Sequence, residues 1–428
     1  MLRKHAMTLA TFFMLAAVST MFSGKALEAQ GLKTLYAFAG GSDGGFPAGG
    51  LISDAHGNLY GTAEGFQSFG TVFELSPASG GGWTHTTIYS FQGASDGASP
   101  VANLIFDGSG NLFGTTSGGG GGVCGGGCGT VFELSPNGSG GWTKTEIYQF
   151  QGGSDGSDPN AALVFDAAGN LFSTTDIGGG SCSVSSLGCG VVFELSPAGG
   201  GLWNETVLHR FGHGADGALP AGGLVFDASG NLYGTTFEGG IVNSTCSSGC
   251  GIVYKLSPAS GGGWTEKGLH AFSGGADGAH PNAGLIFDTA GNLYGTAELG
   301  GASNLGVVYQ LAPVSSSAWI EHVLHSFRGS PDGEIPESGL AMDAGGNIYG
   351  ATSGGGAKSC ICGAVYELSP TTSGSWRPTL LYSFSGGNDG SNPNPNGPLL
   401  LDTAGNLFGV TNEGGSAFRG TAFELLKP

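Results

Sequence analysis

Basic residues are scarce in this sequence, which has 13 Lys and Arg against 32 Asp and Glu and a formal net charge of −19. Binding a polyanion requires a basic stripe, so the composition argues against nucleic acid as a partner. Cations, neutral sugars and other proteins remain open as partners. Helical periodicity and nucleophile motifs are also lacking, and the many Gly-Gly runs lack the strand-to-helix setting of a phosphate loop.

Apolar stretches long enough to cross a membrane are lacking as well. The apolar run at 7–22 is shorter than the roughly 20 residues that a spanning helix needs, which disfavours the alternative of a membrane anchor. Two basic residues precede the run and small residues follow it, as in an export signal. We therefore predict a signal peptide over residues 1–29, cleaved near Ala26 or Ala29. The mature chain is expected to be secreted, periplasmic or on the cell surface, without a transmembrane segment.

Glycine is abundant, with 88 residues in a chain of 428, and it belongs to a repeated motif. The copy at Gly222–Thr236 reads GGLVFDASGNLYGTT, and related copies follow one another at steps of 53 to 61 residues. A repeat this long and regular sets the architecture of the whole chain. The repeated asparagine of the motif occurs seven times, at Asn58, Asn111, Asn170, Asn231, Asn292, Asn347 and Asn406.

Each repeat unit is predicted to form four short antiparallel strands joined by Gly-rich turns. Seven such units predict an all-β fold, a seven-bladed β-propeller over residues 30–428. A β-helix is the competing repeat fold, but its coils are usually shorter and lack an Asx turn in every unit. In one unit the expected strands are Leu104–Asp107, Asn111–Thr116, Gly129–Pro136 and a segment that begins at Trp142.

The two ends of the chain predict how the ring closes. Leu32–Phe38 resembles a fourth strand, and Gly420–Leu425 resembles a third strand that lacks its outer neighbour. Joining them would remove the exposed edges of an open array. Because successive strands reverse direction, the variable Gly-rich loops and the Asp-Gly loops should share one face of the ring. Variable loops on a rigid frame are where binding usually occurs.

The eight cysteines form four local pairs, each within the variable loop of its unit. In an exported protein such close thiols most simply form disulfides, and bridges over so few residues should stiffen a loop more than hold the fold. Zinc is the rival interpretation, but these loops lack nearby histidines and the spacings of a zinc finger. A bridge across a single residue is strained, so the last pair is the weakest prediction. The pairs are Cys124/Cys128, Cys182/Cys189, Cys246/Cys250 and Cys360/Cys362.

Two pairs of motifs, GNLYGTT with GIVYKLSP and GNLFGTT with GTVFELSP, resemble the GloVer-type tandem repeats of exported bacterial proteins. The resemblance covers about Gly31 to Pro428 and implies a propeller of unknown activity. Many such proteins carry C-terminal sorting signals, whereas no such signal follows Leu425 here. The D-x-x-G-N-L-Y hairpin alone is also similar to sensor-kinase periplasmic repeats and to streptogramin-lyase-like propellers.

The repeated aspartates fall into two sets. Those of the D-x-x-G-N turns are expected to be turn formers, because Asp in a Gly turn bonds its own backbone. Those of the Asp-Gly loops lie on the variable face, where hard oxygen ligands could hold calcium, although no loop has dense D-x-D-x-D spacing. Calcium is the one cofactor that the sequence suggests. These candidate ligands are Asp43, Asp96, Asp155, Asp216, Asp277, Asp332 and Asp389.

Residues that depart from the repeat pattern supply the other candidates. His213 and His280 interrupt adjacent Asp-Gly loops, and with Glu238 and Glu298 they could perform general acid–base chemistry. The six periodic tryptophans are expected to pack between blades; if exposed, they would form a sugar-binding series. The candidate ligand-binding residues on the variable face are Glu64, Phe66, Asp176, Phe237 and Glu413.

The sequence thus predicts a monomeric binding or interaction scaffold that meets a protein or carbohydrate through its variable face. Two alternatives remain, an extracytoplasmic lyase- or hydrolase-like enzyme and a structural component of the cell surface. The symmetry of the repeat discriminates among them. An enzyme should break the sevenfold pattern with polar residues that converge on one pocket, whereas a scaffold should spread its departures around a face.

Overall fold

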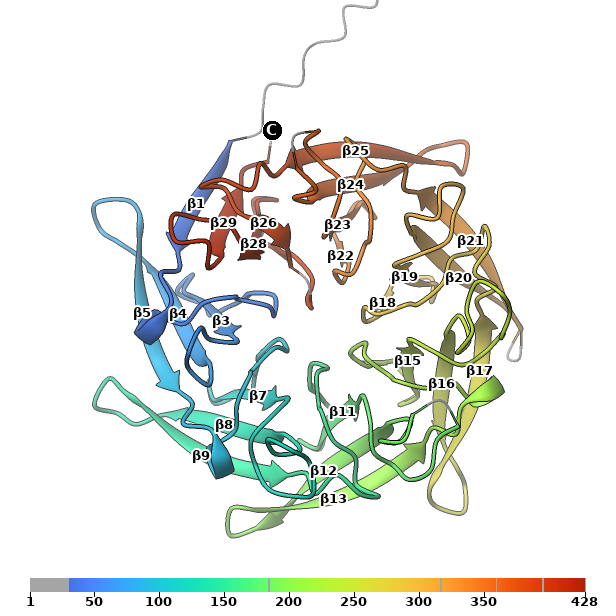
Figure 1. The fold of residues 1–428 in the computed structure, drawn as a ribbon, viewed down its shortest axis with the longest axis horizontal. Coiled ribbons are helices and arrows are strands. Elements are labelled where there is room, and N and C mark those ends of the chain that lie inside the picture. Colours follow the sequence, from blue (N-terminus) through green and yellow to red (C-terminus); the bar gives the residue numbers. More distant parts are fainter. Residues whose placement is uncertain (1–30, 184, 316–317, 359, 395, 428) are drawn as a thin grey trace, which may run out of the picture.

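A computed structural model of the chain describes residues 31–427 except 184, 316–317, 359 and 395. The predicted signal peptide lies outside these residues. The strands form seven antiparallel sheets arranged in a closed ring (Figure 1), which confirms the seven-bladed propeller. Among the described residues, no helix is long and apolar enough to span a membrane.

Each blade runs from a short strand near the ring axis to a long strand at the rim, and we number the blades in chain order. The first strands are β2 (Ile52–Ser53), β6 (Ile105–Phe106), β10 (Val164–Phe165), β14 (Val225–Phe226), β18 (Ile286–Phe287), β22 (Ala341–Met342) and β27 (Leu400–Leu401). The second are β3 (Leu59–Ala63), β7 (Leu112–Thr116), β11 (Leu171–Thr175), β15 (Leu232–Thr236), β19 (Leu293–Ala297), β23 (Ile348–Thr352) and β28 (Leu407–Glu413). The third are β4 (Thr71–Pro77), β8 (Thr130–Pro136), β12 (Val191–Gly199), β16 (Ile252–Pro258), β20 (Val307–Ser315), β24 (Ala364–Pro370) and β29 (Thr421–Leu425). The outer strands are β5 (Trp83–Ser90), β9 (Trp142–Gln149), β13 (Leu202–Arg210), β17 (Trp264–Ala271), β21 (Ala318–Ser326), β25 (Trp376–Ser383) and β1 (Leu32–Ala37).

Three details differ from the sequence prediction. The first strand of each blade pairs over only two residues, because the chain reaches the crowded axis there and turns at once into the D-x-x-G-N hairpin. Blade 7 has an additional strand, β26 (Ser391–Pro393), which pairs with β28. Short 3-10 turns occupy some Asp-Gly loops, namely η1 (Gly41–Asp43), η2 (Ala94–Asp96) and η3 (Gly214–Asp216).

The D-x-x-G-N aspartates form the hairpin turns, as predicted. In blade 4, Asp227 Oδ1 accepts hydrogen bonds from the backbone N–H groups of Ser229 and Asn231, and its Oδ2 accepts one from the Asn231 side chain. Burial opposes ionisation of Asp227, but these hydrogen bonds hold the pKa of its carboxyl below the ordinary value. The same three bonds recur in all seven blades, so the repeated Asp and Asn are fully used in turn formation.

The second glycine of GNLYGTT lies under a large aromatic ring. Gly234 is paired with Tyr254 of the third strand, and a Cβ atom on Gly234 would lie 2.5 Å from the Tyr254 hydroxyl oxygen. On its other side the Tyr254 ring packs edge-on against Phe211, which follows the outer strand of blade 3, with 5.1 Å between centroids. Equivalent ring pairs, 5.0 to 5.3 Å apart, join every blade to the next. These rings make the core continuous around the propeller.

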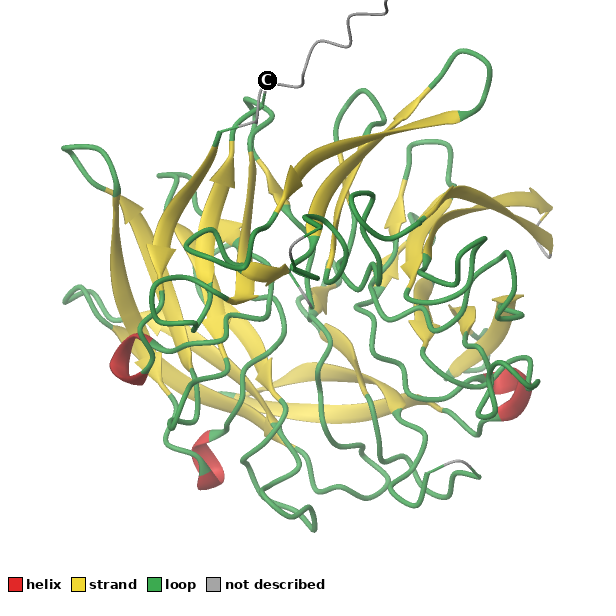
Figure 2. Ribbon diagram, turned by 45° about the horizontal axis from the view of Figure 1, so that its top comes forward, coloured by secondary structure: helices red, strands yellow, loops and turns green. Residues whose placement is uncertain are grey.

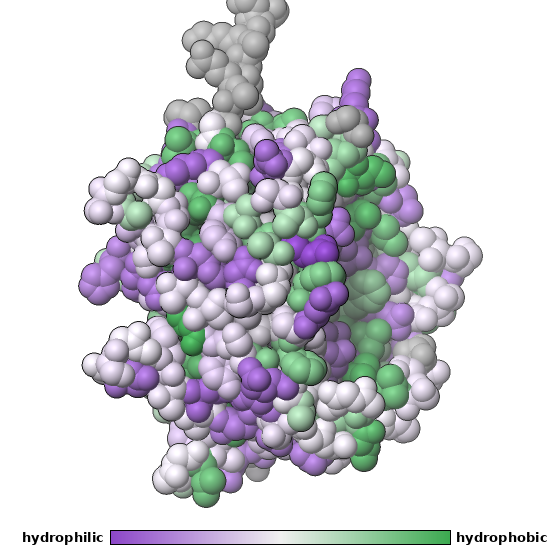
Figure 3. All heavy atoms as spheres, turned by 60° about the vertical axis from the view of Figure 1, so that its left-hand side comes forward, coloured by the Kyte–Doolittle hydropathy of each residue, from purple (hydrophilic) through white to green (hydrophobic). Residues whose placement is uncertain are grey.

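The six tryptophans also pack between blades, as expected. Trp142 at the start of β9, for example, lies edge-on to Tyr60 of the preceding blade, with 6.1 Å between ring centroids. All six are half-buried, so they do not form an exposed series on the rim. The outer strands alternate between half-buried and exposed residues, and the wall in Figure 3 accordingly shows hydrophilic and hydrophobic residues mixed.

The N-terminal strand closes the ring. β1 pairs antiparallel with β29, from Leu32 opposite Leu425 to Ala37 opposite Thr421, and so becomes the outer strand of blade 7. Phe38, which follows β1, is fully buried against Phe73 of blade 1. The chain ends therefore contribute to one sheet and to the contact between the last and the first blade.

Removal of residues 32–38 should lower the melting temperature of the whole domain, because it deletes the outer strand of blade 7 and the Phe38 contact with blade 1. We expect a loss of at least about 3 kcal/mol, the typical cost of removing one buried Phe side chain alone. Thermal unfolding of a chain that starts at residue 39 should be compared with one that starts at residue 31. An unchanged melting temperature would contradict closure by β1.

The substitution Gly234→Ala should destabilise the protein by about 1–3 kcal/mol, since the added methyl group would overlap the Tyr254 ring. Gly261→Ala is the matched control, because a Cβ atom at Gly261 meets nothing within 4 Å. Urea unfolding of the two variants measures the difference. Equal stabilities of the two variants would show that the glycine does not serve this contact.

Candidate functional site

The variable loops and the Asp-Gly loops lie against each other on one face, as the strand order predicts. The backbone N–H of Val123 in a variable loop donates to the carbonyl of Gln151 beside an Asp-Gly loop, at 3.0 Å. Figure 2 shows the long loops and the helical turns extending from one side of the ring. All eight cysteines are paired as predicted, so a disulfide constrains the variable loop in four of the blades.

The second cysteine of each pair is also buried in the core, which the sequence did not predict. Cys250, for example, belongs to the same hydrophobic cluster as Phe272 and Tyr309. Burial occurs because this cysteine stands two residues before the third strand, where the chain has already returned to the blade. These second cysteines are 0 to 5% exposed, and they are Cys128, Cys189, Cys250 and Cys362. In blade 4 the first cysteine, Cys246, is buried as well.

The buried cysteines lie where neighbouring blades meet. The carbonyl of Cys250 accepts a hydrogen bond from the backbone N–H of His280 at 2.8 Å, in the segment that enters the next blade. The carbonyls of Cys128, Cys189 and Cys362 accept equivalent bonds at 2.9 to 3.0 Å. Each disulfide therefore joins the variable loop to a core position at a contact between blades. The prediction that the bridges stiffen a loop more than they hold the fold stays a prediction.

A cavity of about 580 Å³ lies at the centre of the ring. Its wall consists of the ends of second strands and of the segments that lead from the Asp-Gly loops to the first strands. Small residues such as Ala161, Gly222 and Gly284 leave the space open. The charged residues that line it are all acidic, with no Lys, Arg or His among the described lining residues. They are Asp158, Asp176 and Glu337.

A proline motif holds the acidic side chains of this wall in pairs. In each blade a proline follows a non-Gly residue with φ between 54° and 62°, as Pro159 follows Asp158 in blade 3. In blades 1 to 6 the carbonyl of that residue accepts a hydrogen bond from the residue that follows the second strand, as Asp158 does from the N–H of Asp176 at 3.1 Å. The two positions are therefore neighbours in every one of these blades, and in blade 3 both are aspartates.

The blade 3 pair is strongly perturbed. Asp176 Oδ2 accepts a hydrogen bond from Asn160 Nδ2 at 3.0 Å, whereas its Oδ1 is inaccessible to solvent and has no partner among the described residues. Burial, and then the nearby charge of Asp158, raise the pKa of Asp176 to about 7. Burial also raises the pKa of Asp158. At neutral pH this pair therefore holds fewer negative charges than two ordinary carboxylates would.

A second acidic pair joins blades 5 and 6. Burial, and then the charge of Glu337, raise the pKa of Glu298 to about 8, although the Asn282 side chain hydrogen-bonds to this carboxyl and opposes the shift. Burial likewise raises the pKa of Glu337. Asn282 occupies the same position in blade 5 as Asn160 does in blade 3, directly after the proline. Each acidic pair thus has an asparagine beside it.

The four residues considered for acid–base catalysis are only partly brought together. His280 adjoins Glu298 through a backbone hydrogen bond of 3.2 Å, and its ring stacks on Phe237 at 4.5 Å between centroids. His213 instead contacts two serines of the loops, Ser183 Oγ at 2.9 Å and the Ser248 carbonyl at 3.0 Å. Among the described residues, no side-chain hydrogen bond or ion pair joins any two of His213, His280, Glu238 and Glu298.

The other candidates on the variable face have different surroundings. The Arg419 guanidinium covers the Phe66 ring at 3.6 Å from its centroid, so blade 7 and blade 1 meet at this residue. Glu64 is half-buried, and burial raises the pKa of its carboxyl. Glu413 is exposed. None of these three lines the central cavity.

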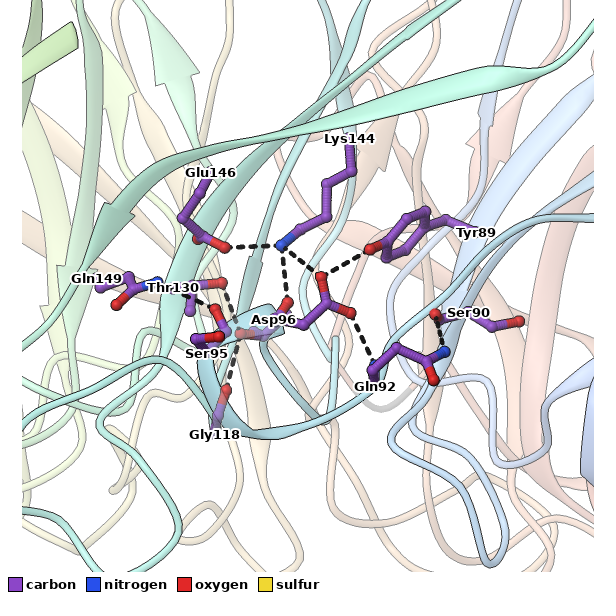
Figure 4. A network of polar contacts seen from close by, with 11 residues as sticks. Tyr89, Ser90, Gln92, Ser95, Asp96, Gly118, Thr130, Lys144, Glu146 and Gln149 are labelled. Atoms are coloured by element: carbon purple, nitrogen blue, oxygen red, sulfur yellow. Dashed lines mark hydrogen bonds and ion pairs between the residues drawn. The ribbon is translucent and has the colours of Figure 1, made fainter.

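The Asp-Gly aspartates have protein partners, which sequence reasoning did not foresee. Asp96 accepts hydrogen bonds from the Tyr89 hydroxyl at 2.6 Å and from the Gln92 backbone N–H at 2.7 Å (Figure 4). The residue four positions earlier donates its backbone N–H to the carboxylate in all seven loops. No group of three His, Cys, Asp or Glu suited to a metal occurs in the described part of the chain. Calcium at these loops stays a prediction.

A protein-family model described as the Gloeobacter/Verrucomicrobia repeat matches residues 20–181 and 240–427. The chain belongs to this repeat family. A comparison with curated proteins finds no match.

Two solved structures have a low similarity to this repeat protein. One is described as a "putative 6-phosphogluconolactonase" from Bacteroides uniformis ATCC 8492, with 16% identity and a TM-score of 0.49 over 79% of this chain and 86% of that one. Another has the same description, from Bacteroides fragilis NCTC 9343, with 14% identity and a TM-score of 0.47 over 79% and 85%. Neither likeness bears on the activity of this chain.

In this Gloeobacter/Verrucomicrobia repeat protein, several residues next to the repeated prolines line the cavity, and sequence reasoning missed them. The signal was present in the alignment of the repeats with one another. The position after the proline is Ala48, Val101 or Ala221 in three blades but a polar residue in the other four. The missed residues are Asp158, Asn160, Asn282 and Glu337.

The variable loops of this repeat protein carry exposed apolar side chains in six of the seven blades. Val123 is 86% exposed and Ile361 75% exposed, and most of the set is aliphatic. Their loops all leave the face that also carries the Asp-Gly loops. The set comprises Phe69, Val123, Leu187, Ile241, Val242, Ile361 and Phe418.

In blades 2 and 3 one side chain of the outer strand lies beside the Asp-Gly loop of the preceding blade. This side chain is basic in blade 2 and acidic in blade 3. In blade 2, the buried Lys144 Nζ contacts Asp96 Oδ1 at 3.1 Å and Glu146 at 2.7 Å. In blade 3 the equivalent residue is Glu205. Burial, and then the charge of Asp155, raise the pKa of Glu205 to about 7. Blade 3 therefore places two acids where blade 2 has an ion pair.

The substitution Glu205→Lys should raise the melting temperature at pH 8, because the lysine would pair with Asp155 as Lys144 pairs with Asp96. The folded-state pKa of Glu205, about 7, is above the ordinary 4.5, so its protonated form contributes stability that is lost as pH rises through this interval. We expect a gain of about 1 kcal/mol, or about 2 °C, at pH 8 and a smaller gain at pH 5.

Thermal unfolding at the two pH values measures this effect. Glu413→Lys is the control, because it makes the same change in net charge at an exposed position. If both variants gained equally at pH 8, the effect would come from the overall charge of −19 and not from the contact with Asp155.

Proposed function

We propose that this propeller is an exported binding scaffold that holds a protein partner on its variable-loop face. The observation that carries the proposal is the set of exposed apolar side chains on the variable loops. Large apolar side chains gathered on one face of a soluble protein are typical of interaction surfaces. The disulfides that tie the same loops to the core support this use, since a constrained loop loses less conformational entropy when it binds.

A protein is favoured over a carbohydrate as the partner. Carbohydrate recognition relies on exposed aromatic rings, and the six tryptophans that could have formed such a series are packed between blades. The exposed set is mainly aliphatic, with Val123, Leu187 and Ile361 among its members. Aliphatic side chains of this kind bury well against apolar protein surface.

Four disulfides support export, because disulfides persist in oxidising compartments outside the cytoplasm. The two alternatives have less support. A lyase- or hydrolase-like enzyme that used the four residues considered for acid–base catalysis would need them to converge, and His213 is engaged instead with Ser183 and Ser248. A purely structural component would not require departures from the repeat to be concentrated in the loops of one face.

Site-specific photo-crosslinking in the native host tests the proposal. A benzophenone amino acid is introduced at Val123, Leu187 or Ile361 in separate variants of the full chain. We expect the same crosslinked partner from at least two of these positions. A further substitution, Val242→Asp, should reduce its yield several-fold, because a charge would be buried in the interface.

Leu202 is the matched control position, since it is 70% exposed and lies at the turn between β12 and β13, at the opposite ends of the strands from the variable loops. It should give no crosslink to that partner. Equal crosslinking from Leu202, or no common partner from the three loop positions, would overturn the proposal.

A further inference from the structure

We propose that the central cavity is a binding site for a small organic cation, a ligand that carries at least one ammonium group. This site is separate from the loop surface proposed to hold a protein. The argument rests on an unpartnered buried oxygen, on the chemistry of the cavity wall and on the size of the cavity.

The unpartnered oxygen is Asp176 Oδ1. It is inaccessible to solvent, and among the described residues only Asn160 donates a side-chain hydrogen bond to this carboxyl group, at the other oxygen. A buried acceptor without a donor is costly, so native structures rarely retain one without a reason. An ammonium group has three N–H donors and could, once the Asp176 carboxyl group turns toward the cavity that it lines, supply the missing bond while also neutralising Asp158.

The wall of the cavity is acidic on two sides. The Asp158 and Asp176 pair belongs to blade 3, whereas Glu337 reaches the cavity from blade 6, and its charge acts on Glu298 of blade 5. The described lining residues supply no cation to compensate these acids, in contrast to the rim, where Lys144 pairs with Asp96. Asn160 and Asn282 add polar groups that can orient a ligand.

The size and composition of the cavity favour an organic cation over a metal ion. A volume of about 580 Å³ falls within the range of small-molecule pockets, roughly 300–1,000 Å³. The described residues contain no group of three His, Cys, Asp or Glu that could hold a metal. Apolar residues such as Leu224, Leu285 and Leu340 also line the cavity and could contact the carbon skeleton of a ligand.

Calorimetric titration of the chain that starts at residue 31 with cadaverine (1,5-diaminopentane) tests the inference. At pH 8 and about 0.15 M salt, where long-range attraction is screened, we expect saturable binding of one equivalent. The uncharged analogue 1,5-pentanediol should not bind. At pH 5.5 the affinity should fall, because Asp176 and Glu298, with pKa values raised to about 7 and about 8, lose negative charge while the diamine stays charged.

Asp176→Asn should weaken cadaverine binding about tenfold or more, the effect expected from losing a hydrogen bond between charged groups. In the absence of ligand this variant should melt no lower than the wild type at pH 8, since it removes a like-charge contact. Glu337→Gln is a second test from the other side of the cavity. Glu413→Gln makes the same change in net charge at an exposed position and should alter the affinity less than about twofold, because exposed charges contribute little.

Several results would overturn the inference. They are binding of the diol as strong as that of the diamine, an unchanged affinity in both cavity variants, and an equal loss in Glu413→Gln. Saturable binding of Ca²⁺ that displaces cadaverine would assign the cavity to a metal instead. Loss of a protein partner from the loop face would leave all of these measurements unaffected, so the two proposals fail independently.

Discussion

The aromatic contact between neighbouring blades is the interaction on which the rest of this structure depends. In each of the seven interfaces, a ring of the third strand lies between the second strand of its own blade and a phenylalanine that follows the outer strand of the preceding blade. Tyr254, with Gly234 below it and Phe211 beside it, is one example. Because each ring serves two blades, no blade can pack alone, and closure by β1 matters to all of them.

The molecule therefore has regions whose sequence repeats in every blade and regions whose sequence varies. The D-x-x-G-N turns use every Asp and Asn for local hydrogen bonds, so they repeat without change. The Asp-Gly loops also use their aspartates, such as Asp96, for local hydrogen bonds. The residue of the next blade's outer strand that lies beside each of these aspartates varies from blade to blade. Freedom to vary remains in the loops after the second strands and in the segments that enter the centre of the ring.

Both proposals concern regions that depart from the repeat. The exposed apolar residues are spread around one face, which is the pattern expected of a scaffold. The central cavity instead concentrates its departures in blades 3, 5 and 6, where paired acids have pKa values raised by burial and mutual repulsion. Such groups oppose folding at neutral pH, and residues that oppose folding are often retained for a ligand.

The sequence by itself determined the propeller, the number of blades, the closing strand, the pairing of the cysteines and the shared loop face. These follow from local turn chemistry and strand alternation, which repeat seven times and so reinforce one another. Only the tertiary structure decided that the second cysteine of each pair, such as Cys250, is buried in the core, because its depth depends on how neighbouring blades pack.

The tertiary structure alone also decided that Asp158 and Asp176 share a wall with Asn282 and Glu337. The two groups lie more than one hundred residues apart, and they meet because the ring directs corresponding segments of different blades toward one axis. A pattern within one repeat reports on turns and strands, which are local, whereas a site at the axis combines residues that no single repeat contains.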